Sequence, residues 1–415
     1  MMQKILVKNV NIVDVVIGSI QREMDILIGK DRIQSIYPSN KVETADAFIV
    51  DCTGKYAVPG LFESHAHLSH LKEMEKDERG NILKGFVKKG IMQVRDVGGP
   101  VDILKDMKEQ IQKGNTCGPD IFYSGPMLEK SPLYWRKINE SMPGFTVAVD
   151  TKEDADRIIS GLLEKGASLV KTFGKFDLPV FEYLLEKAGE NSLPVTHDPG
   201  APLFNMVPMD IAMDLGIRCI EHGKAPWPCV LKDSLQKQHD ELCRNYNHEP
   251  GADEEFAQKV FSMGSDSISE EKLDRLACRM VENNTFFCPT LRVFNERAME
   301  PGEEYSRLIK ILDSISLFCT GKMIKNGVPL LVGIDSCMPD THDEIKLLKD
   351  TGLSDLEILR GATIYPAKWL NMLGDYGSVA QNSKANLFIT EKDPLEDIRN
   401  LMDIYISIKD GRVIN

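Results

Sequence analysis

Residues 58–67 read VPGLFESHAH, an apolar run that ends in two histidines. Side chains two residues apart on a strand point to the same side, so His65 and His67 can point together beyond the carboxyl end of this strand. A lone histidine is usually a packed or solvated residue, but two imidazoles at this spacing can bind one metal ion. The stretch therefore predicts a buried strand that carries metal ligands at its end.

Around this stretch, apolar runs alternate with amphipathic helical segments. Four helical segments end in a glycine just before an apolar run, as a left-handed residue that ends a helix would require. Apolar strand candidates begin near eight positions: Tyr56, Ile91, Ile121, Leu169, Pro194, Arg218, Thr285 and Leu330. Eight alternating β and α units predict a (β/α)8 TIM barrel. An open doubly wound sheet is the rival fold, but no Gly-x-Gly-x-x-Gly follows a first strand to support it.

Both ends of the chain have a different pattern, with short alternating segments and turn signals. Residues 4–37 predict a meander of antiparallel strands, and Asp410-Gly411 predicts the turn of a C-terminal hairpin. Neither end has enough strands to close a core by itself. We therefore expect residues 1–57 and 372–415 to form one small β domain, with the barrel over residues 58–371.

Residues with metal-binding chemistry also end four of the later strand candidates. They are Lys171, His197, His222 and Asp335. A lysine at the end of an apolar strand is costly unless it is paired or modified. Each of the four could separately be a satisfied core residue. Because the carboxyl ends of barrel strands meet at one face, their joint occurrence with the first two histidines indicates a metal centre.

In this pattern the sequence resembles the metal-dependent amidohydrolase superfamily, whose fold is a distorted (β/α)8 barrel flanked by a small β-sandwich. The resemblance covers nearly the whole chain. Its entry motif, Pro-Gly-Leu-x-x-x-His-x-His, stands at residues 59–67. The sequences VRDVGG at 94–99, IEHG at 220–223 and DPLEDI at 393–398 are similar to the branch of imidazolonepropionase-like enzymes, prolidases and related Xaa-dipeptidases.

The resemblance implies two divalent metal ions. His65, His67 and Asp335 would hold the first ion, and His197 and His222 would hold the second; Lys171, carboxylated by carbon dioxide, would bridge them. These ligands include no thiolate and suit Zn²⁺ first, with Mn²⁺, Co²⁺ and Fe²⁺ as alternatives. Two metals that share a water would make hydroxide available at neutral pH. Asp335 would take the proton of that water and deliver it to the leaving group.

The reaction that this implies is hydrolysis of an amide or peptide bond in a small substrate, such as a dipeptide or an N-acyl amino acid. A cyclic-amide or imidazolone hydrolase, or a deaminase, on the same scaffold is the alternative, although deaminases often lack the bridging lysine. A non-catalytic scaffold would have lost metal ligands, and all six are present. Residues 123–128, YSGPML, lack the Gly- and His-rich loop of prolidase-like members, so the resemblance identifies no specific substrate.

Candidate substrate contacts lie in the connections that follow the strands. The long connections 125–150 and 224–269 are expected to be lids, with linker-like insertion as the alternative. Tyr134 could line the pocket or simply pack. Arg292, or else Lys224, could pair with a substrate carboxylate, although Arg292 could equally be a surface residue. His342 could face the substrate or only begin a helix. We expect His70, His239 and His248 to be solvated.

The composition excludes several classes of partner. The 415 residues include 50 Lys and Arg against 63 Asp and Glu, a formal net charge of −13, which disfavours nucleic acid. Nine cysteines without a Cys-x-x-Cys pair predict reduced thiols in a cytoplasmic protein. We find no signal peptide and no run of about 18 apolar residues, so we expect no membrane partner. The expected partners are a small-molecule substrate and further copies of the chain in a homo-oligomer.

Overall fold

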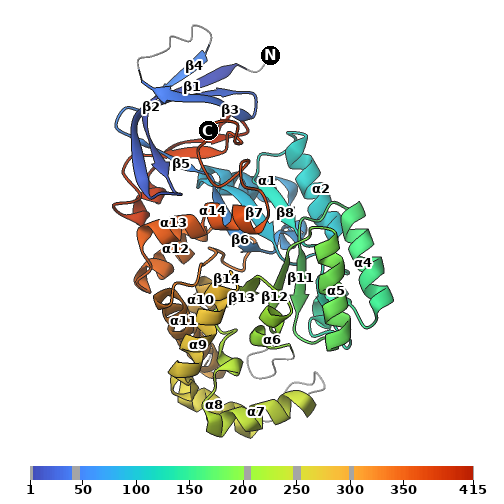
Figure 1. Ribbon diagram of the computed structural model, residues 1–415. Coiled ribbons are helices and arrows are strands. Elements are labelled where there is room, and N and C mark those ends of the chain that lie inside the picture. Colours follow the sequence, from blue (N-terminus) through green and yellow to red (C-terminus); the bar gives the residue numbers. More distant parts are fainter. Residues whose placement is uncertain (1–2, 40–46, 201–206, 246–253, 299–302, 415) are drawn as a thin grey trace.

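Two parallel sheets form the centre of the computed structural model, which describes residues 3–39, 47–200, 207–245, 254–298 and 303–414 (Figure 1). The first sheet contains, in spatial order, β6 (Leu61–Ala66), β7 (Ile91–Asp96) and β8 (Asp120–Tyr123). The second contains, in spatial order, β10 (Thr146–Ala148), β9 (Met127–Glu129), β11 (Val170–Phe173), β12 (Val195–Asp198), β13 (Cys219–Glu221) and β14 (Phe286–Cys288). The α/β class with parallel strands is thus confirmed.

Closure of these strands into one eight-stranded sheet is not observed. Residues 330–336, where we expected the eighth strand, instead form isolated bridges, Leu330 with Phe287 and Ser336 with Ala66. They also accept and donate backbone hydrogen bonds on both sides, for example from Leu331 to Phe287 and from Asp335 to His65. This segment therefore links β14 to β6 without becoming a regular strand.

Helices follow most of the central strands and cover them. They are α1 (Lys76–Lys88), α2 (Val101–Gln112), α3 (Arg136–Ser141), α4 (Lys152–Glu164), α5 (Leu178–Glu190), α6 (Met209–Asp214), α7 (Asp233–Asn245), α8 (Glu254–Met263), α9 (Glu270–Glu282), α10 (Leu291–Ala298), α11 (Glu303–Lys325), α12 (Thr341–Asp350), α13 (Asp355–Gly361) and α14 (Ile364–Trp369). The glycines predicted to end helices at 90, 166, 216 and 327 all have φ between 75° and 106°. Helix α1 buries Leu83, Phe86 and Val87 in the main core, and each such side chain contributes about 1.5–3 kcal/mol. No described helix is long and apolar enough to span a membrane.

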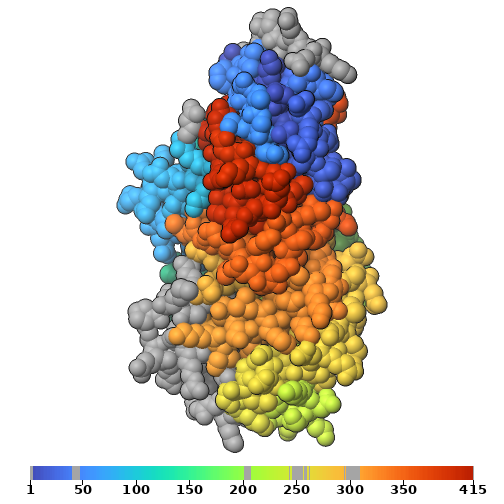
Figure 2. Space-filling view, turned by 90° about the vertical axis from the view of Figure 1, so that its left-hand side faces the viewer, coloured from blue at the N-terminus to red at the C-terminus, as the bar shows by residue number. Residues whose placement is uncertain are grey.

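Strands from both ends of the chain form one eight-stranded sheet. Its order is β17 (Arg412–Ile414), β16 (Ile404–Lys409), β15 (Leu387–Thr390), β5 (Tyr56–Pro59), β1 (Lys4–Asp14), β2 (Ser19–Gly29) and β3 (Arg32–Pro38), with β4 (Ala47–Asp51) also paired to β1. The sheet has its own core, which includes Val7, Ile26 and Leu387. In Figure 2 the C-terminal segment lies between the N-terminal strands and the helices beneath them. The two-layer sandwich and its domain boundaries stay a prediction.

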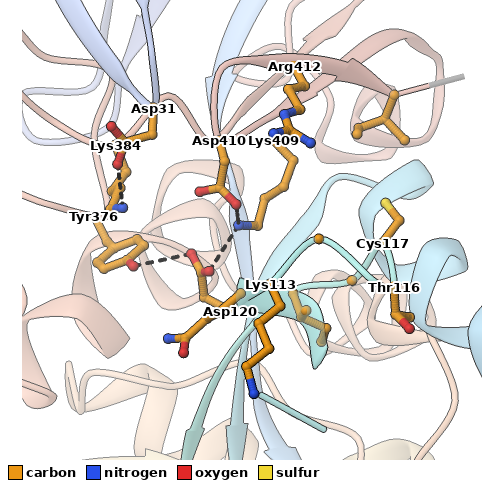
Figure 3. Close-up of a pocket in the computed structure, with 15 residues that line it drawn as sticks. Asp31, Lys113, Thr116, Cys117, Asp120, Tyr376, Lys384, Lys409, Asp410 and Arg412 are labelled. Carbon is orange, nitrogen blue, oxygen red and sulfur yellow. Dashed lines mark hydrogen bonds and ion pairs between the residues drawn. The ribbon is translucent and has the colours of Figure 1, made fainter. Parts of the chain in front are cut away.

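Polar contacts join this terminal sheet to the first parallel sheet beside a cavity of about 570 Å³ (Figure 3). Asp120, which begins β8, accepts hydrogen bonds from Lys409 at 2.9 Å, from the Tyr376 hydroxyl at 3.1 Å and from the Asn386 amide at 2.9 Å. The Lys409 side chain is only 4% exposed. A buried ammonium needs such a partner, so Asp120 should be important for stability.

Replacing Asp120 by Ala should lower the free energy of unfolding by about 2 kcal/mol, because Lys409 and Tyr376 lose a buried partner together. Urea unfolding followed by circular dichroism measures the loss. Asp410→Ala is the matched control, since it removes the more exposed partner of Lys409 and should cost less than about 1 kcal/mol. Equal losses in the two variants would contradict the role assigned to Asp120.

Candidate metal centre and substrate cavity

A cavity of about 410 Å³ lies at the carboxyl ends of β6, β11, β12 and β13. One part of its lining is polar: His65, His67, His70, Lys171, Asp198, His222, Lys224 and Asp335. The other part is mainly apolar: Met127, Tyr134, Trp135, Ile138, Phe145, Phe173 and Gly200. Residues far apart in the sequence thus meet at one end of the parallel strands. We call this space the site cavity.

His65, His67 and Asp335, the His65 cluster, lie close enough together to bind one metal ion. Asp335 Oδ1 is 3.1 Å from His67 Nε2 and 3.6 Å from His65 Nε2. The three ligand atoms lie within 4.8 Å of one another. Burial lowers the pKa of His65 to about 3, so its imidazole is neutral. Burial alone would raise the pKa of Asp335, but the hydrogen bond with His67 holds it well below its usual value. The neutral His65 imidazole and the ionised Asp335 carboxylate are the forms that bind metals. Burial alone would lower the pKa of His67, but the hydrogen bond with Asp335 raises it, so an ion would have to displace the proton on its Nε2.

A buried ion pair orients the His65 ring from behind. Glu221 Oε2 lies 2.7 Å from His65 Nδ1, and Glu221 Oε1 accepts a hydrogen bond from Arg95 Nη2 at 2.6 Å. Thr196 also donates its hydroxyl to Glu221, and the Arg95 guanidinium lies over the ring of Trp369. With Nδ1 held in this way, Nε2 must point into the site cavity. These contacts give a physical role to the VRDVGG and IEHG sequences, which sequence reasoning had left without one.

The His67 ring is oriented by the same VRDVGG segment. Its Nδ1 donates a hydrogen bond to the Gly98 carbonyl at 2.8 Å. Asp96 accepts hydrogen bonds from the backbone N–H groups of Leu68 and Gly98, at 2.6 and 3.2 Å. It thus fixes the segments that follow β6 and β7. A Cβ atom at Gly98 would stand 2.9 Å from the His67 ring, so a larger residue would displace the ligand.

His222, Asp198 and Lys171, the His222 cluster, form a second group across the site cavity. His222 Nε2 lies 3.0 Å from Asp198 Oδ2, and its Nδ1 lies 2.8 Å from the Thr290 hydroxyl. The His65 and His222 rings are 4.8 Å apart, so the two clusters adjoin. Lys171 Nζ is buried, makes no hydrogen bond among the described residues, and lies 4.0 Å from Asp198 Oδ2.

Three residues at these strand ends have strained backbone conformations. His222, Thr290 and Asp335 have φ angles of 72°, 47° and 56°, a left-handed region that is unfavourable for residues with a Cβ. Such strain costs of order 1–3 kcal/mol per residue and persists where the surroundings fix the conformation. Here the conformation turns the His222 and Asp335 side chains toward one cavity.

The structure does not bring His197 to either cluster, and the expectation that it points into the site cavity is corrected. Its Nδ1 lies 2.9 Å from the Thr172 hydroxyl and its Nε2 lies 2.9 Å from the Val207 carbonyl. Its ring packs 5.5 Å from that of Phe181 in α5. Burial lowers the pKa of His197 to about 4, so it is a neutral core residue. The neighbouring Asp198, which sequence reasoning missed, faces the site cavity instead.

Two of the four predicted substrate contacts line the site cavity, namely Tyr134 and Lys224. Arg292 does not line it. Its guanidinium pairs with two acidic residues, with Nη2 3.2 Å from Asp340, just before α12, and Nε 3.6 Å from Asp343, in α12. His342 is buried in the first turn of α12, outside the cavity lining, and burial lowers its pKa to about 4. The expectations that Arg292 binds a substrate carboxylate and that His342 faces the substrate are therefore corrected.

The predictions for the other histidines and the long connections have mixed outcomes. His70 lines the site cavity rather than being solvated, and His239 is buried 6.3 Å from the Phe256 ring. His248 lies outside the described residues. The connection 125–150 supplies Met127, Tyr134, Trp135, Ile138 and Phe145 to the cavity wall. Of the described residues in 224–269, only Lys224 lines it, and α7 and α8 lie at the far end of the molecule (Figure 1).

The donor set of the two clusters fits divalent metal ions. It consists of imidazole nitrogens and carboxylate oxygens without a thiolate, and the His222 cluster adds a buried lysine amine that lacks a hydrogen bond among the described residues. A second possible group, His65 with Glu221 and Cys288, fits poorly. Glu221 is already bound to Arg95, and burial raises the pKa of Cys288 well above its usual value, which keeps the thiol protonated.

Comparison with known proteins agrees with this geometry. Residues 317–414 match the amidohydrolase family. A crystal structure of a Xaa-Pro dipeptidase with bound methionine aligns with a TM-score of 0.75, 18% identity and 99% coverage of both chains. A prolidase complexed with N-methylphosphonate-L-proline aligns with a TM-score of 0.73, 18% identity and the same coverage. At this identity the two structures show the shared fold alone.

Curated relatives match a smaller part of the chain. A dihydroorotase from Carboxydothermus hydrogenoformans is 29% identical over 125 residues, which are 29% of this chain and 28% of that protein. A dihydroorotase from Ruminiclostridium cellulolyticum is 31% identical over 120 residues. The match thus spans little more than a quarter of the length of these relatives. Residues 317–414 thus match the amidohydrolase family, and the fold of the chain as a whole is similar to that of a Xaa-Pro dipeptidase and a prolidase.

Proposed function

We propose that this protein is a metal-dependent hydrolase that cleaves the amide or peptide bond of a dipeptide or an N-acyl amino acid. The observation that carries this proposal is the convergence of His65 Nε2 and His67 Nε2 on Asp335 Oδ1 in the site cavity. The two parallel sheets are interpreted as the distorted (β/α)8 barrel of the superfamily, and the terminal sheet as its β-sandwich. None of the eight described cysteines forms a disulfide, which supports a cytoplasmic location.

Two divalent ions, Zn²⁺ first, are proposed to bind the two clusters, with Lys171 as a carbamate between them. When bound, these ions would supply an acidified water molecule and polarise the scissile carbonyl. Lys171 suits carboxylation because its buried amine lacks a hydrogen bond. Addition of CO₂ to the neutral amine, with release of one proton, would give a carbamate whose single negative charge is shared by two oxygens. Asp335 would hold the proton of the attacking water on its carboxylate and pass it to the leaving nitrogen.

The remaining lining suggests how a substrate is oriented. Tyr134, Trp135 and Phe173 pack against one another, with ring centroids 5.0–6.0 Å apart, and form an apolar wall. Such a wall would accept an apolar side chain and exclude water. Lys224 also lines the site cavity and is the cation proposed to meet a substrate carboxylate.

A cyclic-amide hydrolase is the second candidate, and the partial similarity to two dihydroorotases favours it. Dihydroorotate is a cyclic amide that also carries a carboxylate, so the same cation would serve either substrate class. A substrate screen with metal-reconstituted enzyme separates the two. The panel should contain dipeptides and N-acyl amino acids with apolar side chains, matched cyclic amides, and the corresponding primary amides. Turnover of the linear substrates supports the first proposal; turnover of cyclic amides alone replaces it with the second; no turnover of any C–N bond refutes both.

Replacing Lys224 by Met should raise KM for a substrate with a free carboxylate by roughly 10-fold to 100-fold, the cost of losing one charge-assisted hydrogen bond. The same variant should lose little on the matching substrate whose carboxylate is blocked as an amide. Arg292→Met is the matched control, because Arg292 does not line the site cavity, and it should leave both KM values nearly unchanged. A larger effect of Arg292→Met than of Lys224→Met on the free acid would contradict the assignment.

A further inference from the structure

Strand β12 offers two metal-binding side chains on opposite sides, and its register decides which one faces the site cavity. In the parallel pairing of β11 with β12, Lys171 is opposite Thr196 and Thr172 is opposite His197. Paired residues of neighbouring strands share a side of the sheet. Lys171 and Asp198 therefore line the cavity, with Thr196 on the same side of the sheet, whereas Thr172 and His197 face the helices outside. We propose that Asp198, not His197, joins His222 and Lys171 in binding the second divalent ion, an inference that rests on the proposed function.

The contacts of Asp198 are those expected of a metal ligand. Its Oδ2 lies 3.0 Å from His222 Nε2 and 4.0 Å from Lys171 Nζ, and the side chain lines the site cavity. Its Oδ1 accepts a hydrogen bond from the Gly200 N–H at 2.9 Å, which fixes the plane of the carboxylate. The arrangement repeats that of the His65 cluster, where Asp335 Oδ1 lies 3.1 Å from His67 Nε2. In both places a carboxylate oxygen and an imidazole Nε2 point at each other across one small space.

His222 is also prepared for binding at this position. Its Nδ1 is held 2.8 Å from the Thr290 hydroxyl, so Nε2 is the nitrogen that faces Asp198. Holding the remote ring nitrogen in this way is typical of histidines that bind metals. The 4.8 Å separation of the His65 and His222 rings brings the second ligand group beside the first, where one carbamate could reach both.

His197 has no nitrogen left for an ion. Both of its ring nitrogens are hydrogen-bonded on the outer side, to Thr172 and to the Val207 carbonyl. Turning the ring into the cavity would require a one-residue slip of β12, which would move every side chain of the strand to the other side. That slip would remove Thr196 from Glu221 and place the Asp198 carboxylate against the apolar side chains around Phe181.

Zinc binding by two matched variants tests the inference. Purified wild-type protein, stripped of metal and titrated with Zn²⁺, should bind two ions per chain by calorimetry and elemental analysis. Asp198→Asn should bind one ion tightly, with the second dissociation constant raised at least 100-fold, and Asp198→Glu should restore part of that affinity. His197→Gln should bind two ions as the wild type does, because its amide can keep the hydrogen bond to Val207.

The controls separate a lost ligand from a lost fold. Each metal-free variant should melt cooperatively by circular dichroism; if His197→Gln does not, Thr172→Val replaces it, since it disturbs the His197 side without touching the cavity. Two tightly bound ions in Asp198→Asn, or only one in the His197-side variant, would overturn the role of Asp198 and leave the proposed function standing. A wild-type protein that binds no zinc would refute the inference together with the proposed function.

Discussion

Replacing Asp335 by Asn should lower kcat by roughly 10²- to 10⁴-fold, the range expected when a proton-transfer group is lost. The physical reason is that an amide oxygen can still face His67 but cannot hold a proton at neutral pH. Asp335 lies within the bridged segment 330–336 and lines the site cavity, outside the apolar core, so the variant should fold. Turnover of the best substrate from the screen measures the loss, and KM should change by less than about threefold.

Asp343→Asn is the matched control for this experiment. Asp343 lies in the first turn of α12, is half-exposed, and does not line the site cavity, so its kcat should equal that of the wild type. Metal content should be measured in both variants, because Asp335 is also a proposed ligand. A fully metallated Asp335→Asn enzyme with near wild-type kcat would show that another group moves the proton.

Replacing Lys171 by Met should lower kcat by roughly 10²- to 10³-fold, because the proposed carbamate would supply several kcal/mol of transition-state stabilisation. The variant should be at least as stable as the wild type. A buried amine without a hydrogen bond is costly, and Met fills a similar volume without that cost. Thermal melting of the metal-free proteins and steady-state kinetics of the reconstituted proteins measure the two effects.

Chemical rescue makes this test specific to the carbamate. In Lys171→Ala, short carboxylic acids should occupy the vacated space and restore part of the activity, whereas short alkylamines should not. Rescue by amines but not by acids would show that Lys171 acts as an ammonium, paired with Asp198 at 4.0 Å. An unmodified lysine in fully active, metal-loaded protein would equally exclude the carbamate.

The sequence predicted correctly those features that depend on local pattern. The strand that ends at His65 and His67, six of the seven later strand positions and the glycines that end four helices all follow from periodicity and turn chemistry. These signals are local: the face of a strand, the end of a helix and the spacing of two residues are each set by a few neighbouring residues, without contacts to distant parts of the chain. The prediction of a regular eighth strand was wrong. Residues 330–334 make backbone hydrogen bonds to the segments on both sides, but these bonds do not form a regular ladder.

The tertiary structure alone decided which polar residues belong to the site. In the sequence PVTHDP, at 194–199, either His197 or Asp198 could face the cavity, since both alternations fit the composition. Register against β11 and β13, which pairs His197 with Thr172 and Ile220, places His197 outside and Asp198 inside. Register is a property of three strands at once, and the sequence of one strand does not contain it.

Contacts between distant residues also decide that Lys224, and not Arg292, lines the site cavity. Both are cations that follow a strand end, and the sequence does not distinguish them. Arg292 lies within reach of Asp340 and Asp343, residues about 50 positions later, and these acidic groups hold its guanidinium away from the cavity. Lys224 meets the Gly200 carbonyl at 3.3 Å and stays at the cavity wall. The sequence thus determined which residue types stand at the strand ends, while long-range charge pairing and strand register determined which of their side chains line the site cavity.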